Sequence, residues 1–113
     1  MRPEDGVRIK HILDAAREAI SFAQGHTLDS LEADRMRLLA IIRLVEIIGE
    51  AATAVSLETQ AASPEIPWRT MAATRNRLIH AYFNVDIKIV LETTQLDLPP
   101  LVISLEALMS GEH

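Results

Sequence analysis

Residues 38–54 read LLAIIRLVEIIGEAATA, and their pattern of apolar and polar side chains is the strongest structural signal in the chain. Apolar side chains occupy most of the circumference of an ideal helix built from it, and the main exceptions are Arg43, Glu46 and Glu50. These three residues are spaced three and four apart, so they form one polar stripe of the kind that is usually a solvated helix surface. A helix that is apolar nearly all round must be covered on most of its sides. The sequence therefore predicts a helix at the centre of a helical bundle.

Nothing except Gly49 interrupts this helical pattern between about Leu31 and Leu57. The pattern predicts a helix of roughly 40 Å at 1.5 Å per residue. A single small domain can hardly cover such a helix, which favours a dimer formed through helices. Gly49 costs about 1 kcal/mol in a helix interior, and its presence indicates that another backbone approaches closely there.

The same helical period recurs on both sides of this segment, between glycine, proline and capping residues. The expected helices run from about Pro3 to Gln24, from Trp68 to about His80 or Phe83, from Ile87 to about Thr94, and from about Asp97 to Gly111. Gly25 is expected to end the first helix, and Asp86 and Asp97 to cap the last two. The predicted fold is all-α: a four- to five-helix up-and-down bundle that dimerises through helices, with residues 1–113 in a single domain.

The composition of the chain limits the cellular compartment in which it is expected and the kinds of metal or disulfide site that it can form. The 113 residues include no cysteine, which excludes disulfides and thiolate metal sites. The N-terminus, Met1–Asp5, lacks the apolar core of a signal peptide, and the run Leu38–Ile42 is far too short to span a bilayer. His11, His26 and His113 show no metal-ligand spacing. We therefore expect a cytoplasmic protein without membrane association, metal or other cofactor.

The overall charge is acidic, but one segment is basic. The formal net charge of −5 counts against a general nucleic-acid binder, whose affinity comes from phosphate contacts. The lack of a helix-turn-helix with a basic recognition helix argues in addition against a DNA-binding regulator. Arg69, Arg75 and Arg77 nevertheless form a local positive patch. Such a patch suits phosphate binding, because a guanidinium group can hold two oxygens at once.

Arg75 and His80 are the candidates for chemistry in this segment. Five residues at 100° each place them about 140° apart on an ideal helix. Either the helix ends or kinks near His80, or a second copy of the chain brings the two residues together. Asn76, four residues before His80, would share its face and could orient the imidazole or hold a phosphate oxygen. Taken alone, this spacing favours a structural histidine, and Tyr82 is more often core than site.

Phosphodiester cleavage would fit these residues. When the nucleophile is the neighbouring ribose 2′-hydroxyl, the reaction needs no metal. It needs a group with a near-neutral pKa to move a proton and a cation to stabilise charge on the phosphate, roles that suit histidine and arginine. Tyr82 could add a hydrogen-bond donor or stack on a base.

The segment Arg75–Tyr82, RNRLIHAY, resembles the R-x4-H-x-Y motif of HepT-type toxins within the HEPN superfamily. Residues 66–69 (IPWR), residues 83–86 (FNVD) and residues 41–52 (IIRLVEIIGEAA) fit the same family, so that the resemblance covers about Asp14 to Leu108. Two positions depart from the family pattern. Ala81 stands where a polar residue or glycine is common, and Thr74 stands where a larger apolar residue is usual, which would alter helix packing slightly.

The resemblance implies a homodimer with two motif copies in a composite cleft, acting as a metal-independent endoribonuclease that leaves a 2′,3′-cyclic phosphate or a related end. By motif position, Arg75 and His80 would be catalytic and Asn76 would support them. The family further implies a partner, a minimal nucleotidyltransferase antitoxin, which adenylylates (AMPylates) Tyr82 and so blocks the cleft. Arg69 and Arg77 are candidates for contacts with RNA phosphates.

Two functions follow from these expectations. The first is an RNA-cleaving toxin of a type II toxin–antitoxin system. The alternative is a non-catalytic helical dimer that binds the nucleotidyltransferase or a nucleotide, in which Arg75 and His80 would hold a ligand phosphate without cutting it.

Overall fold

The computed structural model describes residues 1–81 and 84–111, apart from the side chains of residues 75, 76, 79–81, 84 and 85. Its elements in chain order are α1 (Pro3–Ala23), α2 (Leu28–Glu32), α3 (Arg35–Ala54), α4 (Leu57–Ala62), α5 (Trp68–Leu78), β1 (Ile79–Ala81), β2 (Asn84–Val85), α6 (Ile87–Glu92), the π-helical turn η1 (Thr93–Asp97) and α7 (Leu98–Ser110).

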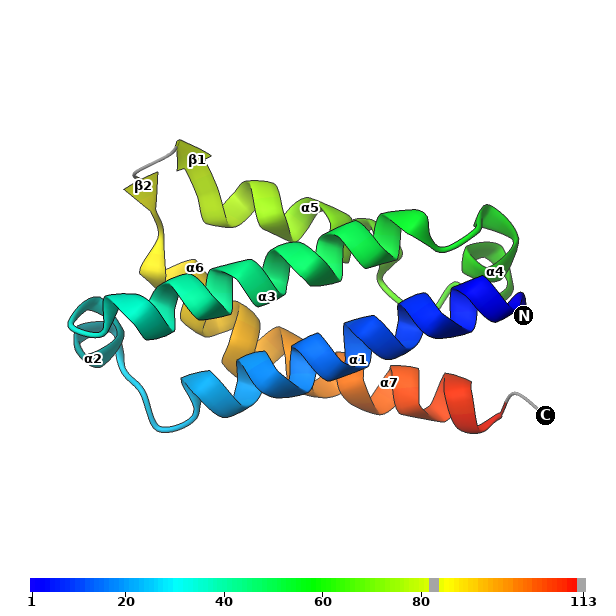
Figure 1. Cartoon of the computed structure of the whole chain (residues 1–113), viewed down its shortest axis with the longest axis horizontal. Coiled ribbons are helices and arrows are strands. Elements are labelled where there is room, and N and C mark those ends of the chain that lie inside the picture. Colours follow the sequence, from blue (N-terminus) through cyan, green and yellow to red (C-terminus); the bar gives the residue numbers. More distant parts are fainter. Residues whose placement is uncertain (82–83, 112–113) are drawn as a thin grey trace.

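The long segments of the chain form an up-and-down bundle. The helices α1, α3 and α5 and the run from α6 to α7 alternate in direction, which brings both chain ends to one end of the molecule (Figure 1). Strand structure within the described ranges is confined to β1 and β2, which pair antiparallel with Ile79 opposite Val85 and Ala81 opposite Asn84. The predicted all-α fold is confirmed.

The first helix and the turn after it follow the expected local chemistry. Gly25 has φ +78°, a left-handed conformation that L side chains rarely adopt, and α1 ends just before it. The Thr27 hydroxyl then accepts a hydrogen bond from the Ser30 amide, while the Ser30 hydroxyl accepts one from the Thr27 amide. This reciprocal capping box starts α2.

The prediction of one uninterrupted helix over Leu31–Leu57 is wrong at both ends. The Asp34 carboxylate accepts a hydrogen bond from the Arg37 amide and starts α3 there, while the Ser56 hydroxyl accepts one from the Thr59 amide and starts the separate helix α4. These cap residues satisfy amides at each new helix start. The helix α3 itself has 20 residues, or about 30 Å. No helix among the described residues has the length and apolar content to cross a bilayer.

The expected break between the fourth and fifth helices is also absent. Asp86 caps α6 as predicted, by accepting a hydrogen bond from the Ile89 amide. Asp97, however, is αR and caps nothing with its side chain, because the chain continues into α7 through η1. In the wider π-helical turn, the Leu98 amide donates its hydrogen bond to the Thr93 carbonyl, five residues earlier. Pro99 and Pro100, which follow, supply no amide hydrogens.

The core consists of two clusters of buried side chains. One lies where α1, α3, α5 and α7 meet, and includes Ile12, Ile48, Trp68 and Leu101. The second lies towards the other end of α3, where Leu31, Ile41, Leu78 and Val90 pack together. Leu78 is the last residue of α5, so the second cluster fixes the point at which the chain leaves the bundle for β1.

Candidate active site

The R-x4-H-x-Y motif spans the junction between α5 and the hairpin. Arg75 and Asn76 lie in the last turns of α5, and His80 lies in β1. On an ideal helix Arg75 and His80 would lie about 140° apart, but the helix ends at Leu78, before His80. This is the first of the two explanations that the sequence left open. The expected helical face shared by Asn76 and His80 does not exist, because the chain is already extended at His80.

Part of the motif falls outside what the structure describes. Tyr82 and Phe83 are not among the described residues, and the side chains of Arg75, Asn76 and His80 are not described. The roles assigned to Arg75, Asn76, His80 and Tyr82 stay predictions, carried by their places in the chain.

The hairpin that carries His80 is anchored where it joins the bundle. The Asp86 amide donates a hydrogen bond to the Leu78 carbonyl at 3.4 Å, which closes the base of the hairpin. Leu78 is fully buried, and four residues beyond Asp86 the side chain of Val90 is fully buried beside it in the second cluster. The position of β1 thus depends on apolar packing on both sides of its base.

The helix α5 has a buried face and an exposed basic one. Trp68, Met71, Thr74 and Leu78 are buried at a spacing of three or four residues, and the Trp68 indole donates a hydrogen bond to the Ser63 carbonyl at 3.0 Å. The two arginines expected to touch RNA, Arg69 and Arg77, are exposed, and neither has an ion pair within the described part of the chain. Eight residues of helix separate them by about 12 Å along the axis.

Gly49 brings α3 and α5 into close contact, as predicted. A Cβ atom at Gly49 would lie 3.2 Å from the Met71 carbonyl oxygen and 3.7 Å from that of Ala72. In a regular helix these two carbonyls accept hydrogen bonds from the amides four residues later, which belong to Arg75 and Asn76. The glycine therefore sets how deeply the motif-bearing turns of α5 rest on α3.

Gly49→Ala is expected to lower stability, whereas Gly6→Ala is expected to raise it. Gly6 also lies in a helix, but a Cβ atom there meets nothing within 4 Å. Alanine should thus gain about 0.5–1 kcal/mol at Gly6 from helix propensity alone. At Gly49 this gain is offset by displacement of α5, at a cost of about 1–3 kcal/mol. Urea unfolding of both variants measures the difference, and an equal gain at the two positions would contradict the packing argument.

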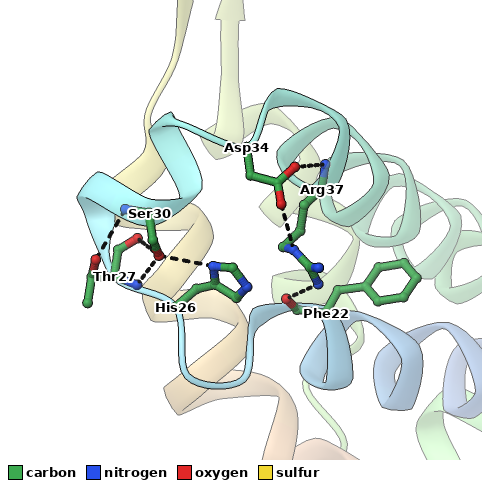
Figure 2. Close-up of polar contacts among 6 residues, drawn as sticks. All are labelled: Phe22, His26, Thr27, Ser30, Asp34 and Arg37. Carbon is green, nitrogen blue, oxygen red and sulfur yellow. Dashed lines mark hydrogen bonds and ion pairs between the residues drawn. The ribbon is translucent and has the colours of Figure 1, made fainter.

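A separate polar cluster joins α1, α2 and the start of α3 (Figure 2). Arg37 donates to the Asp34 carboxylate and to the Phe22 carbonyl, each at 3.0 Å, and its hydrogen bonds lower the pKa of Asp34. His26 Nδ1 lies 3.0 Å from the Ser30 hydroxyl. These contacts hold the loop after α1 in place. Among the described residues, no three His, Asp or Glu side chains gather in a way that could hold a metal ion.

Comparison with known proteins identifies the family to which the sequence is similar. A family model described as Ribonuclease HepT-like matches residues 12–108, which include α3, α5 and the whole motif. No solved structure matches significantly.

Curated relatives agree with the family model. A probable ribonuclease HepT of Thermococcus cleftensis is 38% identical over 96 residues, which are 81% of this chain and 87% of the relative. A putative RNase of Caldanaerobacter subterraneus is 30% identical over 104 residues, 92% of this chain and 93% of the relative. A putative RNase of Methanocaldococcus jannaschii is 32% identical over 90 residues, 80% of this chain and 83% of the relative. The chain therefore belongs to the HepT-like ribonuclease family.

Proposed function

We propose that this protein is a metal-independent endoribonuclease, with Arg75 and His80 as its catalytic pair. The observation that carries the proposal is the family match over residues 12–108, because it includes the complete R-x4-H-x-Y motif. The anchoring of this motif supports the proposal further. The helix that bears Arg75 rests on α3 at Gly49, and the strand that bears His80 is closed at its base by Asp86.

The reaction proposed is attack of a ribose 2′-oxygen on the adjacent phosphorus. His80 takes the proton from the 2′-hydroxyl, the new bond to phosphorus forms, and the bond to the 5′-oxygen breaks. The products are a 2′,3′-cyclic phosphate and, once the departing oxygen is protonated, a 5′-hydroxyl. Arg75 stabilises the negative charge that builds up on the phosphate oxygens, and Asn76 supports the pair by hydrogen bonding. Arg69 and Arg77 contact neighbouring phosphates.

We infer in addition that the active form is a homodimer. The face of α3 opposite its buried side carries Met36, which is 85% exposed, and Leu39, which is 47% exposed. Further along the same face Arg43 pairs with Glu50 at 3.2 Å. A two-fold axis would set this face against the same face of a second copy, as in an isologous interface, and would bury its exposed apolar side chains. The second copy would complete the cleft around the motif.

Leu39→Asp is expected to convert the dimer to a single chain of 12.5 kDa, because a buried unpaired carboxylate opposes association. The matched control is Ile103→Asp on α7, where the side chain is 68% exposed on a different helix. Light scattering coupled to size exclusion measures both masses. A dimer that survives Leu39→Asp, or is lost only with Ile103→Asp, would rule out the α3 face as the interface.

The proposed physiological context is a type II toxin–antitoxin system. A nucleotidyltransferase antitoxin would transfer an adenylyl group from ATP to the Tyr82 hydroxyl, two residues from His80 in the chain, with release of pyrophosphate and the phenol proton. The bulky anion would occupy the phosphate site and neutralise the charge of Arg75. In this proposal the cleft and the partner, and not the whole surface, carry recognition. A net charge of −5 is therefore compatible with action on RNA.

RNA cleavage in excess EDTA is the experiment that tests the function. Protein shown by mass spectrometry to be unmodified at Tyr82 is incubated with total cellular RNA, beside a His80→Ala control. Wild-type protein is expected to cut, and the new 3′ ends should resist periodate because a cyclic phosphate blocks the ribose diol. Cleavage only after a divalent metal is added would disprove metal independence. Nucleotide binding without any cleavage, from a folded dimer, would favour the non-catalytic alternative.

A further inference from the structure

A small cavity lies beneath α5, on the side where it faces α3, η1 and α7. Its volume is about 40 Å³, and its walls are mainly apolar, with Val45, Met71 and Leu101 among them. Thr74 and Thr93 contribute hydroxyl-bearing side chains to the same walls. One water molecule needs at least about 10–15 Å³ of such space, so the cavity can accommodate one.

Thr93, one of the residues that line this cavity, has a buried hydroxyl without a hydrogen bond among the described residues. Thr93 is only 2% exposed, and its Oγ1 has no hydrogen-bond partner within the described part of the chain. The neighbouring Thr94, 1% exposed, donates its hydroxyl to the Val90 carbonyl at 3.0 Å. A buried hydroxyl without a hydrogen bond costs roughly 1–3 kcal/mol, and such groups are rare in folded proteins.

Thr74 offers the complementary group. It is 7% exposed and donates its hydroxyl to the Thr70 carbonyl at 2.6 Å, so its oxygen still has capacity to accept. Thr74 lies on α5 directly before Arg75, whereas Thr93 lies at the start of η1. Asp97, an exposed residue at the end of η1, also lines the cavity, and a carboxylate can accept a hydrogen bond.

We propose that this cavity is a specific internal water site. The water accepts a hydrogen bond from the Thr93 hydroxyl and donates one to Thr74 Oγ1, with its second hydrogen directed to Asp97. Such a water satisfies the buried Thr93 hydroxyl and joins the π-helical turn to the helix that carries the motif. Cavities lined only by apolar groups stay dry, and here the threonine hydroxyls make the difference.

The test is a set of threonine-to-valine variants, which change a hydroxyl to a methyl group at nearly constant volume. With water bound, Thr93→Val removes one of its partners and should lower the Tm by about 3–5 °C. With a dry cavity, the same change removes an unpaired hydroxyl and should raise the Tm. Thr94→Val is the matched control, since it loses an ordinary hydrogen bond within the helix.

Coupling between the two threonines distinguishes one shared water from separate effects. Thr74→Val and Thr93→Val together should lower the Tm by clearly less than the sum of the single changes, because the second change finds the bridge already broken. Cross-relaxation between bound water and the amides around Thr93, seen by NMR in wild type and lost in the double variant, is the direct observation expected. A raised Tm in Thr93→Val, strictly additive effects, or no bound-water signal would each overturn the proposal.

Discussion

His80→Ala should reduce the rate of RNA cleavage at least about a hundredfold, because a positioned proton-transfer group contributes roughly 10²–10⁴-fold. Arg75→Ala should cost a similar factor, since it removes the cation that stabilises the transition state. Neither change is expected to unfold the protein, since the two core clusters among the described residues keep all of their apolar side chains in both variants. Initial rates on a defined oligonucleotide, together with thermal melting, measure the two effects separately.

A matched control for the histidine is His11→Ala. His11 is exposed on α1, and its loss should leave cleavage unchanged. Arg77→Ala serves a different purpose: loss of a phosphate contact should raise KM and weaken the salt dependence while kcat is retained. Unchanged cleavage in a folded His80→Ala variant would remove His80 from the site. Loss of fold in that variant would assign it a structural role.

Mixing the two inactive variants tests whether the cleft is composite. If Arg75 of one protomer and His80 of its partner serve the same phosphate, each mixed dimer keeps one complete site. Random exchange should then restore about a quarter of wild-type activity, because half of the dimers are mixed. If both residues act within one chain, the mixture stays inactive.

The central part of the fold could be predicted from the sequence, but the ends of its helices could not. Hydrophobic periodicity identified the long helix, and the cost of a mid-helix glycine indicated the contact that Gly49 makes with α5. The same periodicity passed through Asp34 and Ser56 without a signal. Their side chains accept hydrogen bonds from nearby amides and start new helices. Such capping competes with continuation of the previous helix, and the spacing of apolar residues does not reveal it.

The helix that begins the motif ends at Leu78, earlier than the predicted end at His80 or Phe83, and so agrees with the alternative of a helix end near His80. The motif could be found by resemblance, whereas the helix end at Leu78 depends on a bond from the Asp86 amide to the Leu78 carbonyl. That bond joins residues eight apart, and no local propensity encodes it. The cavity lined by Thr74 and Thr93 likewise could not be predicted, because it depends on how α3, α5, η1 and α7 pack together.

Asp5 is a buried carboxylate that no sequence pattern singles out. It is 1% exposed, and its oxygens accept hydrogen bonds from the Ser56 amide at 2.9 Å, the Ser56 hydroxyl at 2.6 Å and the Thr59 hydroxyl at 2.7 Å. These partners lie more than 50 residues away in the chain. The Ser56 hydroxyl has the largest effect and, with the other two donors and the charge of Arg2, lowers the pKa of Asp5 to about 2 despite the opposing effect of burial.

Asp5→Ala is accordingly expected to be among the most destabilising single changes, at about 3 kcal/mol or more. It leaves the Ser56 amide and two hydroxyls, the Thr59 one buried, without their charged acceptor, and it disconnects the start of α1 from the start of α4. Asp14→Ala is the matched control on the same helix, because Asp14 is exposed and reaches Arg17 only at 4.0 Å. Its loss should cost less than about 0.5 kcal/mol. Urea unfolding at neutral pH compares the two, and similar costs would contradict the role given to Asp5.

The pH dependence gives the same carboxylate an independent test. Its folded pKa, about 2, lies below the ordinary value of 3.8, so ionised Asp5 stabilises the fold fully above the ordinary value and loses this effect as pH falls towards 2. The shift corresponds to about 2 kcal/mol. Asp5→Asn cannot ionise, so the difference in unfolding free energy between wild type and Asp5→Asn should shrink by that amount between pH 5 and pH 2. A difference that stays constant across this range would mean that Asp5 is held by its shape and not by its charge.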